Sequence, residues 1–80
     1  MKENKTAYYV AEELQGKVNL FLKIIEQMKD LIESYKQSEF IDKEEVQKII
    51  YKYKCKIEAY QEVVDILENS LGIWEGIINV

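Results

Sequence analysis

Residues 46–78 decide the fold, and they read VQKIIYKYKCKIEAYQEVVDILENSLGIWEGII. Apolar side chains recur in this stretch at alternating steps of four and three residues, which are the a and d positions of a heptad repeat. They are, in order, Val46, Ile50, Tyr53, Ile57, Tyr60, Val64, Leu67, Leu71, Trp74 and Ile78. Because a single helix in water cannot bury such a stripe, the pattern predicts a long helix packed against other helices.

A second stripe with the same spacing runs through the first half of the chain. It consists of Ala7, Ala11, Leu14, Val18, Phe21, Ile25, Met28, Ile32 and Tyr35. Gly16 falls outside this stripe, and the heptad phase is the same on both sides of it. We therefore expect one helix over residues 6–37 and a second over residues 43–78.

The heptad pattern breaks at residues 38–42, and the residues that follow are typical of a helix start. Asp42 and Glu45 have the spacing of a capping box, and Ile41 and Val46 have that of a hydrophobic staple. A connection this short makes consecutive helices antiparallel neighbours. Residues of the two helices whose numbers sum to about 80 are therefore expected at the same height along the hairpin axis.

Length and composition agree with this fold class. The 80 residues suit one domain, residues 1–80, and the lack of proline together with three glycines favours long helices over a turn-rich sheet. The sequence therefore predicts an all-α protein, an antiparallel helical hairpin of two long helices.

Two helices alone leave apolar side chains uncovered, because further apolar residues flank the second stripe on one side. We expect two hairpins to dimerise into a four-helix bundle. The dimer interface predicted from the second helix consists of Ile49, Tyr53, Ile57, Tyr60, Val63 and Ile66.

Charge favours an antiparallel dimer. Residues 48–56 carry lysine and no acid, whereas residues 58–75 carry acids and no lysine. Two antiparallel copies would set the lysine half of one helix against the acidic half of the other. A parallel dimer or a tetramer also fits the heptads.

No residue pattern indicates catalysis, a metal site or a cofactor. The chain has no histidine, so neither a histidine base nor histidine metal ligands are present. Glu58, Glu62 and Asp65 share a helix face, which we interpret as a solvated acidic surface rather than a cation site. Cys55, the single cysteine, falls opposite the stripe and is interpreted as an incidental surface thiol. We expect a non-enzymatic protein.

Two surface patches are candidates for binding. Large apolar residues near the end of the chain and two tyrosines near its start form a candidate surface for a protein partner: Tyr8, Tyr9, Ile73, Trp74 and Ile77. The other patch interleaves lysine with tyrosine, as single-stranded nucleic-acid surfaces do: Lys48, Tyr51, Lys52, Lys54 and Lys56. The net charge of −4 and the lack of arginine favour the protein partner over nucleic acid.

The same features bear on location and role. No apolar run approaches the roughly 20 residues that span a bilayer, so no membrane association is expected. A single cysteine and the lack of a secretory leader pattern predict a cytoplasmic location. The leading hypothesis is a regulatory or inhibitory protein that binds an unidentified protein partner as a helical homodimer. The alternatives are a helical dimer that binds RNA or DNA and a structural oligomer.

Overall fold

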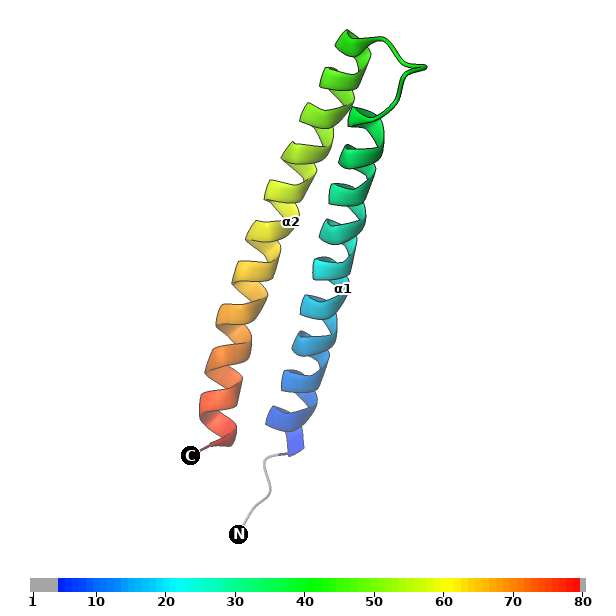
Figure 1. Ribbon diagram of the computed structural model, residues 1–80. Helices are drawn as coiled ribbons and strands as arrows, with labels where there is room; N and C mark the ends of the chain where they lie inside the picture. Colours follow the sequence, from blue (N-terminus) through cyan, green and yellow to red (C-terminus); the bar gives the residue numbers. More distant parts are fainter. Residues whose placement is uncertain (1–4, 80) are drawn as a thin grey trace.

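The protein is a hairpin of two antiparallel α-helices, as the computed structural model shows for residues 5–79 (Figure 1). Helix α1 spans Lys5–Lys36 and helix α2 spans Lys43–Ile78. The start of α1 and the end of α2 lie together at one end of the rod, called the open end below, and the turn lies at the other. The predicted all-α hairpin is confirmed, and each helix begins and ends within one residue of its expected position.

The two stripes face each other along a continuous seam between the helices. Val18, Ile25 and Val64 form one buried cluster in it, and Ile32, Val46 and Ile50 form another. Aromatic rings from opposite helices meet beside these clusters, with ring centroids 5.5 Å apart for Phe21 and Tyr60 and 6.2 Å apart for Tyr35 and Tyr53. The pairing of Phe21 with Tyr60 confirms the predicted register.

The turn differs from the sequence prediction in one respect, because the capping box does not form. The side chain of Asp42 makes no capping hydrogen bond, and its carbonyl oxygen accepts the first hydrogen bond of the helix, from the Val46 N–H at 2.9 Å. The Glu45 carboxylate lies along the helix, 3.7 Å from the Lys48 ammonium. The hydrophobic staple is present, since Ile41 packs against the cluster that contains Val46.

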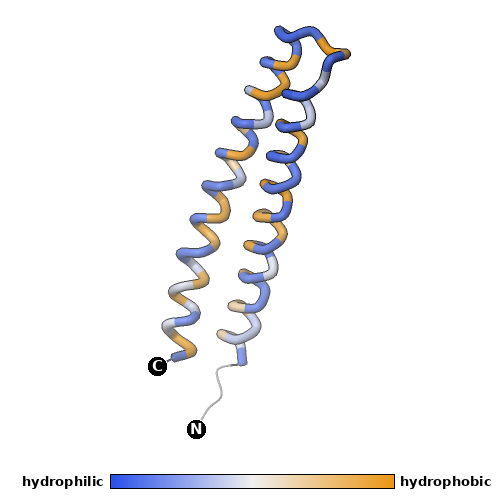
Figure 2. Tube along the Cα trace, viewed as in Figure 1, coloured by the Kyte–Doolittle hydropathy of each residue, from blue (hydrophilic) through white to orange (hydrophobic). Residues whose placement is uncertain are grey.

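The seam divides the remaining surface into two flanks. In the heptad lettering used here, Val18 of α1 and Val64 of α2 are a positions. The e positions of both helices lie on the same side, because Gln15 and Glu75 line one cavity there and Lys29 and Lys54 line another. The g positions of both helices therefore share the opposite side. Figure 2 shows hydrophobic residues recurring turn after turn along both helices, between hydrophilic ones.

Candidate interaction surfaces

One side of the hairpin, called the apolar flank here, carries most of the uncovered apolar side chains. It is formed by the c and g heptad positions of both helices, and the seam leaves these positions without a partner helix. Its apolar members are Val10, Leu20, Ile24, Leu31, Ile49, Ala59, Val63, Ile66, Ile73 and Ile77. Six of them are large and well exposed: Leu20, Leu31, Val63, Ile66, Ile73 and Ile77.

The opposite side, called the polar flank, is formed by the b and e positions. It carries mainly charged and amide side chains, of which Gln15, Lys29, Lys54 and Glu75 are examples. Leu22 is a well-exposed aliphatic side chain on this side of α1. The two flanks therefore differ in chemistry although the same two helices build both.

The structure places the six predicted interface residues in two different environments. Tyr53, Ile57 and Tyr60 are partly buried in the intramolecular seam, where they pack against the core clusters. Ile49, Val63 and Ile66 lie on the apolar flank, the first half-buried and the other two exposed. The flank also includes residues of α1 that the predicted interface omitted, although the apolar g positions of that helix widen its stripe in the sequence.

The five residues predicted to bind a protein partner are not gathered on one surface. Ile73 and Ile77 belong to the apolar flank, whereas Trp74 is half-buried in the seam. Tyr8 lies on the polar flank, and Tyr9 is exposed on the outer side of α1. The patch therefore consists of separate contacts around the open end.

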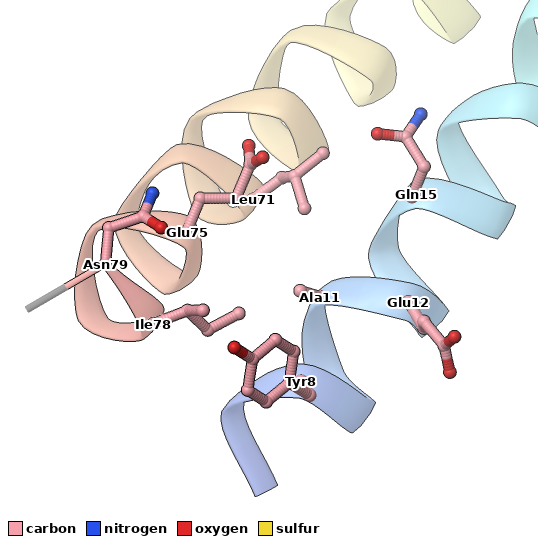
Figure 3. Close-up of a pocket in the computed structure, with 8 residues that line it drawn as sticks. All are labelled: Tyr8, Ala11, Glu12, Gln15, Leu71, Glu75, Ile78 and Asn79. Atoms are coloured by element: carbon pink, nitrogen blue, oxygen red, sulfur yellow. The ribbon is translucent and has the colours of Figure 1, made fainter. Parts of the chain in front are cut away.

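Tyr8 also lines a cavity of about 320 Å³ at the open end (Figure 3). Its ring reaches from α1 toward Ile78 of α2, and the apolar side chains of Ala11 and Leu71 lie deeper between the helices. The side chain of Glu12 points away from α2. The cavity therefore has an apolar floor, and Gln15, Glu75 and Asn79 contribute polar groups to its lining.

The turn exposes an aromatic residue that the sequence interpretation passed over. Phe40 is 99% exposed, more than the other large hydrophobic residues of the described chain. Its sequence signal is an aromatic residue inside a turn, where no neighbouring element can cover it. It adds an apolar contact point at the end of the rod opposite Tyr8.

The predicted nucleic-acid face is spread around α2. Lys48, Lys52 and Lys56 follow one side of the helix at steps of four residues, and Tyr51 is exposed beside them. The Lys56 ammonium lies 5.6 Å from the centroid of the Tyr53 ring. Lys54 is on the polar flank, where it lines a cavity together with Asp30 and Glu33. Acidic groups therefore interrupt this basic surface.

The remaining candidates for chemistry are exposed on α2. Cys55 is a free surface thiol, and the Asp65 carboxylate accepts a hydrogen bond from the Gln61 amide at 3.2 Å. Within residues 5–79, no three side chains of the His, Cys, Asp or Glu type come together in a way that could hold a metal ion. Neither helix, over its described length, is sufficiently apolar to cross a membrane.

Comparisons of the chain with protein-family models, with curated proteins and with solved structures found no match. The interaction surfaces are therefore interpreted from their own residues.

Proposed function

We propose that this chain is a small non-enzymatic regulatory or inhibitory protein of the cytoplasm, which acts by protein–protein interaction as a helical homodimer. The observation that carries the proposal is the apolar flank. Six large aliphatic side chains are exposed on this one side, and a concentration of exposed apolar surface on one side of a protein is typical of a binding site.

The small core gives a second reason to expect association. A two-helix hairpin of 80 residues buries a smaller share of its surface than larger domains do, and packing against another helical layer adds to that core. The proposed assembly is a four-helix bundle made of two hairpins.

Regulation by binding fits the rest of the surface. The open end offers the exposed rings of Tyr8 and Tyr9, which provide contact area and hydroxyl groups for a protein partner. The free thiol of Cys55 is consistent with a reducing compartment and supports a cytoplasmic location.

The proposal is tested first by the mass of the protein in solution. We expect light scattering at micromolar concentration to give twice the chain mass of 9.5 kDa, with no further growth as the concentration rises. A stable monomer would refute the proposal. A mass that keeps rising with concentration would favour the structural oligomer instead, because open assembly does not stop at two copies.

A helical dimer that binds RNA or DNA is the second candidate, and the exposed Lys48, Lys52 and Tyr51 favour it. We expect single-stranded RNA to show no salt-dependent retention on the wild-type protein, because the net charge is −4 and acidic side chains lie near Lys48 and Lys54. Retention at low salt that is lost in the double variant Lys52→Glu and Lys54→Glu, with the dimer intact, would establish this alternative in place of the first.

A further inference from the structure

We infer that the apolar flank is occupied by a second copy of the same chain, packed face to face and antiparallel, so that each turn lies beside the partner's open end. This rests on the proposed self-association. It adds the surface that is used, the contribution of both helices and the orientation of the two copies.

The width of the flank indicates a two-helix partner. Leu20 and Leu31 of α1 and Ile66 and Ile73 of α2 are exposed on the same side, so a single docking helix would leave one of the two rows uncovered. A second hairpin presents two helices at the same spacing, and its ridges can pack into the grooves of the first.

The size of the flank is also sufficient. The apolar members of the flank extend from Ile49 to Ile77 on α2, which is about 43 Å of helix, and the Cα trace of the hairpin is 15 Å wide. This face offers roughly 650 Å² per copy, polar side chains included, which lies within the roughly 600–1,000 Å² that each partner buries in a standard protein interface.

The flank is centred along the rod, which a reversed copy requires. Its apolar members run from Val10 to Leu31 on α1 and from Ile49 to Ile77 on α2, so their midpoints fall near residue 20 and residue 63. These midpoints lie at nearly the same level, because Phe21 contacts Tyr60. A two-fold axis through that level lays the two flanks over each other when one rod is reversed.

Charge selects the reversed orientation. The half of the hairpin near the open end is acidic, with Glu12, Glu13, Glu62, Asp65, Glu68 and Glu75 against Lys5 and Lys17. Parallel packing would bring two acidic ends together. Reversal sets each acidic half of α2 opposite the lysine-rich half of its partner, at an interaxial distance of about 8–10 Å, which is comparable to the Debye length at physiological salt. Lys52 and Lys56 are at c and g positions on the flank itself, whereas the acidic side chains in the acidic half of α2 are at b, e and f positions. The opposite charges therefore attract each other through the field rather than as ion pairs.

The surface is tested by a matched pair of leucines in α1. Leu31 on the apolar flank is 42% exposed and Leu22 on the polar flank is 41% exposed. We expect Leu31→Lys to raise the dimer dissociation constant by about tenfold or more, whereas Leu22→Lys changes it by less than about twofold. Analytical ultracentrifugation measures the dimer dissociation constants of both variants, and circular dichroism checks that each variant is folded. Ile73→Lys, on the same flank and 67% exposed, replaces Leu31→Lys if the latter does not fold.

The orientation is tested by the distance between the two turns. A Glu39→Cys variant in a Cys55→Ser background carries one spin label per chain, at an exposed turn position. We expect double electron–electron resonance to give a distance between the two labels of nearly a full rod length, the rod being 65 Å long. In a parallel dimer the labels would be within about 20 Å, which corresponds to two interaxial distances.

The outcomes are distinguishable. A monomeric wild-type protein refutes the proposed function and this inference together. A dimer that tolerates the flank variants, or that Leu22→Lys dissociates, refutes the surface alone. A short distance between the turns refutes the orientation alone.

Discussion

Replacement of Val64 by aspartate is expected to unfold the hairpin, whereas the same replacement at Val63 is expected to leave it folded. Val64 is 0% exposed and packs in the cluster with Val18 and Ile25. A carboxylate at this position would be buried without a partner, which costs several kcal/mol. That cost is comparable to the total stability of a domain this small, about 3–5 kcal/mol.

Val63 is a closely matched control, because it differs from Val64 mainly in its surroundings. It is the adjacent residue in the same helix and has the same side chain, but it is 37% exposed on the apolar flank. Far-UV circular dichroism and urea denaturation should show loss of helix for Val64→Asp and a cooperative transition for Val63→Asp. We also expect Val63→Asp to weaken the dimer. A native-like spectrum for Val64→Asp would contradict the described seam.

The heptad stripes determined the hairpin, because their period specifies both the helices and the faces that meet. Val18 and Val64 fall on stripes that the sequence already shows, and the structure buries both. Spacing alone could not show that the capping box does not form. Glu45 has two neighbours within reach, the Asp42 backbone and the Lys48 ammonium, and the structure pairs it with the lysine. Spacing identifies such partners without ranking them.

Only part of the apolar flank could be predicted from the sequence, for a related reason. A heptad stripe does not reveal whether its partner helix belongs to the same chain or to another copy. The pattern therefore predicts Tyr53 and Tyr60 at the dimer interface, whereas in the structure each ring lies against an aromatic ring of α1. Leu20 of α1 was missed because it lies outside the stripe. Its place on the flank follows only once the antiparallel register shows which sides of the two helices coincide.

Replacement of all three glycines by alanine is expected to stabilise the hairpin by about 2 kcal/mol. In a helix interior, alanine favours the folded state by about 1 kcal/mol relative to glycine. Gly16, Gly72 and Gly76 lie in helices, none has a positive φ, and an added Cβ would meet no atom within 4 Å at any of them. At fixed protein concentration the melting temperature should rise by about 10 °C.

The single variants show how much each glycine contributes to the increase in stability. Gly16→Ala, in the middle of α1, should contribute about 1 kcal/mol, whereas Gly76→Ala should contribute less because the last turn of α2 ends at Ile78. Their dimer dissociation constants should match that of the wild type, because neither glycine lies on the apolar flank. If Gly16→Ala instead weakened the dimer while raising the helical content, a second backbone must approach at that glycine. The copies would then meet along the outer side of α1, and the apolar flank would need a different partner.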